Sequence, residues 1–188
     1  MRIKKTIIII ICLFSVLGYA QKSEYLVLEK SDTVYGEKII HNHKGIILKN
    51  GTNKIMYNDS LVKGYYKSKY NSYYEKVPSP FGWDFDKPNK MVFIKRLTKD
   101  GRIKLYYKSS GSGVTYSVYL FISKSGGELK GLPTGGGFAR LKFAKKSTYK
   151  QLKPFIEDNN EISVELDSIE STKDAFIKLI NKYNKSFE

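Results

Sequence analysis

Cysteine and histidine are nearly missing from this chain of 188 residues, which contains one cysteine and two histidines. Cys12 lies inside an apolar stretch near the N-terminus, so the rest of the chain has no thiol for a disulfide, a nucleophile or a thiolate metal site. His41 and His43 would point the same way on a strand, but a tetrahedral metal site needs further ligands that Asp or Glu would have to supply. We therefore expect no metal site and no other cofactor.

Signatures of common catalytic and nucleotide-binding sites are missing as well. The chain has no G-x-S-x-G turn and no G-x-x-x-x-G-K-[ST] loop, and a Ser-His-Asp arrangement would have to use one of the two histidines. Two carboxylates, Asp84 and Asp86, flank Phe85 in a proline-rich segment that also holds Trp83, the only tryptophan. We expect a non-enzymatic protein, and a hydrolase that uses these two carboxylates is an alternative.

The N-terminus has the three parts of a secretory leader. A basic start precedes an apolar run over residues 6–17, and the small residues Gly18 and Ala20 come before Gln21. The run is about twelve residues long, whereas a membrane span needs about 20. The pattern predicts a signal peptide over residues 1–20 and a single domain over residues 21–188. It also predicts no transmembrane span after cleavage, and a periplasmic or extracellular location.

N-terminal sequencing of the protein from its native host should therefore give a chain that begins at Gln21. Cys12 would be removed with the leader, and the residue before it, Ile11, is not the small residue that lipid attachment requires. A native chain that retains Met1, or one that carries lipid on Cys12, would contradict cleavage after Ala20.

Negative charge is scarce in the body of the chain. Residues 22–153 hold 26 Lys and Arg against 10 Asp and Glu, a net charge of +16, whereas residues 154–188 hold 4 against 8, a net charge of −4. A basic exported body favours anionic partners such as acidic glycans, nucleic acid or the membrane surface. Lys greatly outnumbers Arg, the residue suited to bidentate phosphate recognition, so a general contribution to solubility remains open.

Short apolar runs separated by turn residues predict antiparallel strands over residues 24–123. Asn50-Gly51 is a strong hairpin signal, and Lys99-Asp100-Gly101 marks a second hairpin. On the strand after it, Ile103 and Leu105 face one side, and Lys104 and its even-numbered neighbours face the solvent. The expected fold class is α+β: mainly antiparallel β-sheet, as a meander or in a strongly curved or barrel-like form, with one or two C-terminal helices.

The C-terminal part changes to helical periodicity over about residues 148–184. Thr148-x-x-Gln151 has the pattern of a capping box that starts one helix, and Ser171-x-x-Asp174 has the pattern for another. In the second, Phe176, Leu179, Ile180 and Tyr183 recur at i, i+3, i+4 and i+7, which predicts an amphipathic helix packed on the sheet. The acidic segment 161–170 between them fits a strand or a linker.

Residues 64–76, GYYKSKYNSYYEK, are rich in tyrosine and lysine, with five tyrosines and three lysines. A break at residues 68–71 would place the tyrosines on two strands as cross-strand pairs with lysine at the rim. The alternative is a surface that binds a ligand. The candidate ligand-binding residues are Trp83, Tyr65, Tyr66, Tyr73, Lys67, Lys69, Lys104, Tyr106 and Lys108.

Three motifs combine turn residues with core positions. They are Asp32-Thr33-Val34-Tyr35-Gly36, Gly101-Arg102-Ile103-Lys104-Leu105-Tyr106, and Leu179-Ile180 with Tyr183-Asn184. In this order they resemble a group of small, secreted, β-rich proteins of unknown function from Bacteroidota. The resemblance implies a fold rather than a reaction, and it brings no catalytic residue with it.

Together these features favour an exported, non-enzymatic protein of the cell envelope or the extracellular space that binds a partner or serves as a scaffold. The partner would be an anionic envelope polymer or another envelope protein. Two alternatives remain. One is a binder of anionic polymers that uses the Lys and Tyr faces, and the other is a carboxylate-dependent hydrolase centred on the Trp83 loop.

Overall fold

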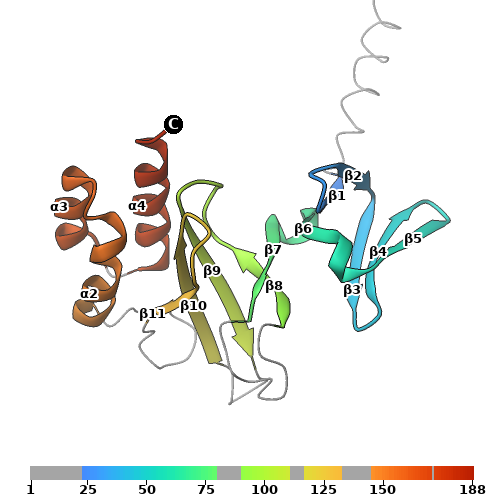
Figure 1. The fold of residues 1–188 in the computed structure, drawn as a ribbon, viewed down its shortest axis with the longest axis horizontal. Helices are drawn as coiled ribbons and strands as arrows, with labels where there is room; N and C mark the ends of the chain where they lie inside the picture. Colours follow the sequence, from blue (N-terminus) through green and yellow to red (C-terminus); the bar gives the residue numbers. More distant parts are fainter. Residues whose placement is uncertain (1–22, 80–89, 111–116, 133–144, 171) are drawn as a thin grey trace, which may run out of the picture. The chain divides into compact units, whose positions relative to one another are not determined.

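The computed structural model describes residues 23–79, 90–110, 117–132, 145–170 and 172–188 (Figure 1). The chain divides into two compact units, residues 1–71 and 72–188. Antiparallel strands build both units, and helices follow at the C-terminal end, so the predicted α+β class is confirmed. Among the described strands neither sheet closes into a barrel, and the described residues at the C-terminal end form three helices where one or two were expected. The single-domain prediction stays a prediction.

The described part of the first unit has six strands in two antiparallel sets. One set has the order β6-β1-β2 and the other has the order β3-β4-β5. The strands are β1 (Glu24–Leu28), β2 (Thr33–Gly36), β3 (Lys38–Asn42), β4 (Gly45–Asn50), β5 (Asn53–Tyr57) and β6 (Val62–Lys67). Successive side chains of a strand point to opposite faces, and those that point inward form a small core. Its members are Leu26, Ile39, Ile46, Leu48, Val62 and Tyr65.

A buried carboxylate connects three segments of this unit. Glu24 on β1 is 5% exposed and accepts hydrogen bonds from the backbone N–H of Ile39 on β3 and, at 3.1 Å, from that of Ser68 after β6. Buried polar groups are stable only when they are hydrogen-bonded, and this carboxylate supplies acceptors for two backbone donors. It therefore fixes the start of β1 against both neighbours.

The hairpin near Asn50 and the break at residues 68–71 are confirmed, but the position of the hairpin loop was predicted wrongly by one residue. Asn50 pairs with Asn53 across a two-residue loop, and Gly51 has φ +57° at the first loop position, where a type II′ turn uses glycine. The loop therefore lies one residue later than Asn50-Gly51. The break after β6 is a single 3₁₀ turn, η2 (Ser68–Tyr70), followed by Asn71 in the left-handed conformation with φ 44°.

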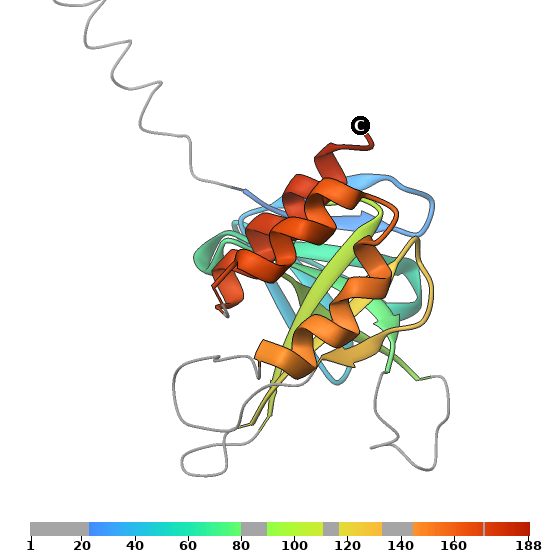
Figure 2. The ribbon, with the colours of Figure 1, turned by 90° about the vertical axis from the view of Figure 1, so that its left-hand side faces the viewer.

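The second unit is an antiparallel sheet with helices on one face, and its strand order is β11-β10-β9-β8-β7. The strands are β7 (Ser72–Pro78), β8 (Met91–Arg96), β9 (Ile103–Ser110), β10 (Ser117–Lys124) and β11 (Lys130–Leu132). The helices are α2 (Lys145–Ile156), α3 (Asn160–Ser168) and α4 (Lys173–Lys185). Figure 2 shows the three helices in orange and red in front of these strands. The sequence predicted a proline-rich loop over residues 77–90, and this prediction is wrong at its start because Val77 and Pro78 belong to β7; residues 80–89 lie outside the described residues.

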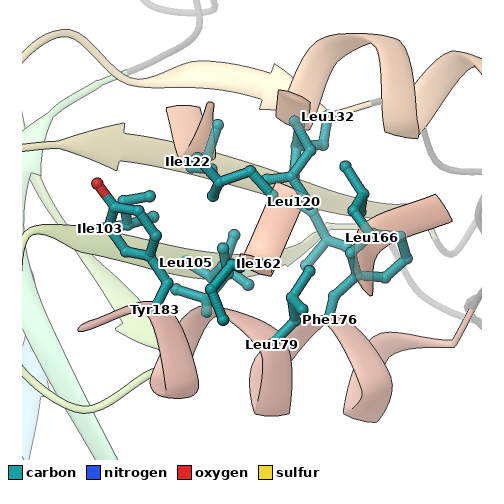
Figure 3. Packing of buried hydrophobic residues seen from close by; sticks show 13 residues of the cluster. Ile103, Leu105, Leu120, Ile122, Leu132, Ile162, Leu166, Phe176, Leu179 and Tyr183 are labelled. Carbon is teal, nitrogen blue, oxygen red and sulfur yellow. The ribbon is translucent and has the colours of Figure 1, made fainter. Parts of the chain in front are cut away.

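The main core lies between this sheet and the helices (Figure 3). The sheet contributes Ile103, Leu105, Leu120, Ile122 and Leu132, and the helices contribute Leu152, Ile156, Ile162, Leu166, Phe176, Leu179, Ile180 and Tyr183. All four residues of the predicted stripe on α4 are at most 2% exposed, so the prediction that this helix packs on the sheet is confirmed.

Other helix predictions are wrong in detail. α2 begins three residues before Thr148, which is fully buried inside the helix and does not start it. The segment expected as strand or linker is α3, which begins after the N-cap Asn159, whose side chain accepts from the N–H of Ile162. Thr172 caps α4, and Ser171 lies outside the described residues. Burial of the apolar side of α3, with Ile162 and Leu166, outweighs its acidic composition.

Asn184 at the end of α4 is joined to β9 by a pair of hydrogen bonds. Its Oδ1 accepts from the N–H of Ile103 and its Nδ2 donates to the Ile103 carbonyl, both at 2.8 Å, and the side chain is 4% exposed. A Cβ at Gly101 would lie 2.4 Å from Cγ of Asn184, so only glycine leaves room for this amide. Residues of two distant motifs, Gly101-Arg102-Ile103 and Tyr183-Asn184, therefore meet in space.

The side of β9 that was expected to face the solvent is partly buried. Tyr106 is 3% exposed and packs with Val77, Ile94 and Phe121 in a second small cluster. The alternation along β9 was therefore predicted correctly, but the polar residues on this side do not form a fully solvated face.

Among the described residues, no helix is long and apolar enough to cross a membrane.

Candidate functional site

Three tyrosines form a row across three neighbouring strands of the first unit. The register places Tyr25 of β1 opposite Tyr35 of β2 on one side and opposite Tyr66 of β6 on the other. The ring centroids of Tyr25 and Tyr66 are 5.2 Å apart with planes 15° from parallel, and those of Tyr25 and Tyr35 are 5.8 Å apart. We call Tyr35, Tyr25 and Tyr66 the tyrosine row.

The row lies on the side of the sheet that faces away from the core. Leu26 follows Tyr25 and Tyr65 precedes Tyr66, and these two residues are opposite one another and buried at 0% and 4% exposure. Strand alternation therefore turns Tyr25 and Tyr66 outward. Both are half-buried, and Tyr35 at the edge strand is 60% exposed. Tyr25 and Tyr66 stack on one another, so each covers one face of the other ring, and the ring of Tyr35, whose plane is tilted 54° from that of Tyr25, is the most accessible of the three.

A local hydrogen bond fixes one end of the row. The hydroxyl of Tyr66 donates to Oδ1 of Asn71 at 2.8 Å. Asn71 adopts a left-handed conformation, which asparagine tolerates better than most residues. The turn after β6 thus holds the Tyr66 ring in place, and stacking on Tyr25 restricts it further. An ordered aromatic surface loses little conformational entropy when it binds a ligand.

Lysines lie near this row along the chain. Lys63 on β6 and Lys69 in the turn after it are exposed, and they flank the segment that carries Tyr66. The ammonium of Lys69 lies 5.5 Å from the ring centroid of Tyr70, and that of Lys67 lies 5.6 Å from the ring centroid of Tyr65. Lys67 and Tyr65, both candidate residues, therefore contact each other, although Tyr65 itself is buried.

Tyr65 belongs to a polar chain on the core side. Its hydroxyl lies 3.4 Å from Nδ1 of His41, and Nε2 of His41 lies 3.3 Å from a carboxylate oxygen of Asp59. The order hydroxyl, imidazole, carboxylate is that of a hydrolytic triad, but the hydroxyl belongs to a tyrosine that is 4% exposed. No group of three metal-ligating side chains occurs in the part of the chain that the structure describes.

Tyr106 and Lys104 of the second unit meet around Glu75 of β7. Its Oε1 lies 2.8 Å from the Lys104 ammonium, and its Oε2 accepts from the Tyr106 hydroxyl at 3.1 Å and from Arg96 at 3.2 Å. Arg96 also lies over the ring of Tyr73, 4.6 Å from its centroid. Lys104 and Arg96 are 22% and 13% exposed, so this network is mostly removed from solvent.

Burial and charge shift two ionisations in this network. Burial, together with the neighbouring Glu75 carboxylate, raises the pKa of the Tyr106 phenol far above its ordinary value, so the hydroxyl remains a donor. Burial alone would raise the pKa of the Asp100 carboxyl, but hydrogen bonding and attraction to Lys104, with Arg96, outweigh it and the pKa lies below its ordinary value. Asp100 therefore adds a second negative charge beside the same two cations.

The remaining candidates are Lys108 and Trp83. Lys108 is half-buried on β9 and has partners of its own. Trp83 lies outside the described residues, as do Asp84 and Asp86 of the hydrolase alternative.

Sequence reasoning missed Tyr25 and Tyr35, which complete the row with Tyr66. Their alternation with buried Leu26 and Gly36 was a usable signal for an outward orientation, but their proximity depends on the register of β2, β1 and β6. No protein-family model matches the chain, and no curated protein or solved structure is significantly similar to it. The resemblance to secreted β-rich proteins therefore stays a prediction.

Proposed function

We propose that the protein is an exported, non-enzymatic binding protein of the periplasm or the extracellular space, and that its first unit holds an acidic glycan on the tyrosine row. The observation that carries this proposal is the register of Tyr35, Tyr25 and Tyr66, which places three rings side by side, two of them half-buried and that of Tyr35 60% exposed. Export is inferred from the leader pattern of residues 1–20.

Stacking is the interaction that this surface offers. A pyranose ring presents a face of C–H groups, and such a face packs on the electron-rich face of an aromatic ring. Tyrosine also offers a hydroxyl at the ring edge for hydrogen bonds with sugar hydroxyls. A row of rings along one direction suits a linear polymer better than a compact ligand.

The charge of the protein favours an acidic rather than a neutral polymer. Residues 22–153 carry a net charge of +16, and exposed Lys63 and Lys69 lie on either side of Tyr66 along the chain. Positive potential raises the association rate of polyanions, and each contact with an anionic group contributes less as salt rises. We therefore infer that stacking provides most of the contact and that lysines select for carboxylate or sulfate groups.

Replacing Tyr35 by alanine should weaken binding to a uronic-acid polysaccharide by roughly tenfold, because one stacked ring contributes roughly 1–3 kcal/mol by analogy with base stacking. Tyr35→Phe should retain most of the affinity. Tyr35 is the most suitable position because it is 60% exposed and contributes little to the core. Calorimetric titration at low and moderate salt, with a neutral polysaccharide beside the acidic one, measures both the stacking and the charge dependence.

The matched control is Tyr70→Ala. Tyr70 is 56% exposed, close to the value for Tyr35, but lies in the turn after β6 and not in the row. It should bind as the wild type does. Equal loss from Tyr70→Ala and Tyr35→Ala would contradict a specific role of the row. Tighter binding of a single-stranded oligonucleotide than of any acidic glycan would reassign the same surface to nucleic acid.

A further inference from the structure

Strand β5 is an edge strand with apolar side chains on both faces. It stands last in the order β3-β4-β5 of the described strands, as Figure 1 also shows. Ile55 and Met56 point to opposite faces and are 55% and 63% exposed. Edge strands usually carry polar or charged residues that discourage pairing with another chain, and β5 has only Lys54 for that purpose.

The register of the β4–β5 hairpin defines which backbone groups lie on the open edge. Asn50 pairs with Asn53 next to the two-residue loop, and Leu48 pairs with Ile55. Residues that flank such a loop form a hydrogen-bonded pair, and hydrogen-bonded and non-hydrogen-bonded pairs then alternate. Ile55 therefore directs its N–H and C=O toward β4, whereas Lys54 and Met56 direct theirs away from it.

We propose that β5 pairs with β5 of a second copy of this chain, antiparallel and with the two-fold axis at Ile55. Lys54 then lies opposite Met56 of the second copy, and Met56 lies opposite Lys54 of the second copy. These are the residues whose backbone groups point outward, so the pairing forms four hydrogen bonds between the two chains. Ile55 faces Ile55 of the second copy in a non-hydrogen-bonded pair, in which side chains lie closest.

This register also avoids repulsion between like charges. A two-fold axis at Lys54 would place two lysines opposite each other, which is destabilising. An axis at Met56 would place Lys54 opposite Asn58, which already caps the 3₁₀ turn that follows β5. The axis at Ile55 alone uses the whole strand and keeps the charges apart. A contact of two short strands is small, so the dimer is weak and reversible.

Sedimentation velocity of the purified protein tests this pairing. The weight-average sedimentation coefficient should rise with concentration into the sub-millimolar range, and it should rise more at higher salt because screening reduces the repulsion between two strongly basic chains. Binding of an acidic glycan should respond to salt in the opposite direction. The two proposals can therefore fail independently.

Two substitutions should abolish the rise. Met56→Pro removes an N–H that points outward and that the hairpin does not use, and an edge strand tolerates proline at such a position. Met56→Val keeps this N–H and is the control, so it should still dimerise. Ile55→Lys places two lysines opposite each other at the two-fold axis. If Met56→Pro lowers the melting temperature, its loss of dimer could reflect unfolding, and Ile55→Lys then tests the pairing instead. A wild-type chain that stays monomeric, or dimers that persist in Ile55→Lys, would overturn the proposal.

Disulfide trapping gives the register. In the chain that begins at Gln21, which has no cysteine of its own, Ile55→Cys should be cross-linked rapidly on oxidation, because Cα atoms of a non-hydrogen-bonded pair are about 4.5 Å apart and disulfides span about 4.4–6.8 Å. Met56 is at least as exposed as Ile55, but in this register Met56 of one chain and Met56 of the other are offset by two residues along the paired strands. Met56→Cys should therefore be cross-linked much more slowly. Equal rates would overturn the axis at Ile55.

Discussion

Replacing Asn184 by alanine should lower the free energy of unfolding by about 2–5 kcal/mol, because it leaves two buried backbone groups without partners and each such group costs about 1–3 kcal/mol. The amide of Asn184 bonds both the N–H and the carbonyl of Ile103 at 2.8 Å. Truncation also opens a space next to Gly101, whose missing side chain accommodates the amide. Chemical denaturation followed by far-ultraviolet circular dichroism measures the change.

Asn181→Ala is the matched control for this variant. Asn181 lies on the same helix, and its side chain accepts a single hydrogen bond, at 3.0 Å, from the exposed N–H of Lys99. Water can replace that bond, so the loss should stay below about 1 kcal/mol. Equal losses of stability for the two variants would show that the hydrogen bonds between Asn184 and Ile103 contribute no more to stability than an exposed bond does.

Replacing Glu75 by alanine should lower the free energy of unfolding by about 2–4 kcal/mol, since removing one partner of a buried ion pair leaves the other charges uncompensated. Glu75 is 13% exposed and accepts from Arg96, Lys104 and Tyr106. Arg96 and Lys104 both keep Asp100 as a partner. The loss of stability should therefore be smaller than for a buried charge that is left with no partner at all. Urea unfolding at neutral pH measures it.

Asp100→Ala separates burial from charge in this network. Asp100 contacts the same two cations, at 3.2 Å from Arg96 and 3.1 Å from Lys104, but it is 76% exposed. Exposed ion pairs contribute about 0–1 kcal/mol, so this variant should change stability only slightly. If Asp100→Ala is as destabilising as Glu75→Ala, the burial of Glu75 is not what makes it important.

Features defined by local chemistry could be predicted from the sequence. The stripe of α4 has the helical period, and its residues are buried as the period indicates. The hairpin near Asn50 and the break at residues 68–71 depend on a few adjacent turn residues. In each case the information lies within one element, so no knowledge of its neighbours was needed.

Features that depend on distant partners could not be predicted. Lys104 looked like a solvated rim residue because its partner Glu75 lies 29 positions away in the sequence. The tyrosine row requires β6 to pair with β1 in one register, and a shift of one residue would turn Tyr66 toward the core. α3 was missed because its few apolar residues lie among acidic ones, and only packing against α2 and α4 selects the helix.

Nuclear magnetic resonance shows residue by residue whether a glycan binds to the tyrosine row. The isotopically labelled protein is titrated with a uronic-acid oligosaccharide, and ring and backbone signals are followed residue by residue. We expect saturable shifts centred on Tyr25, Tyr35 and Tyr66, with smaller shifts at Lys63 and Lys69. Shifts confined to the second unit, or no saturable shift at low salt, would contradict this expectation.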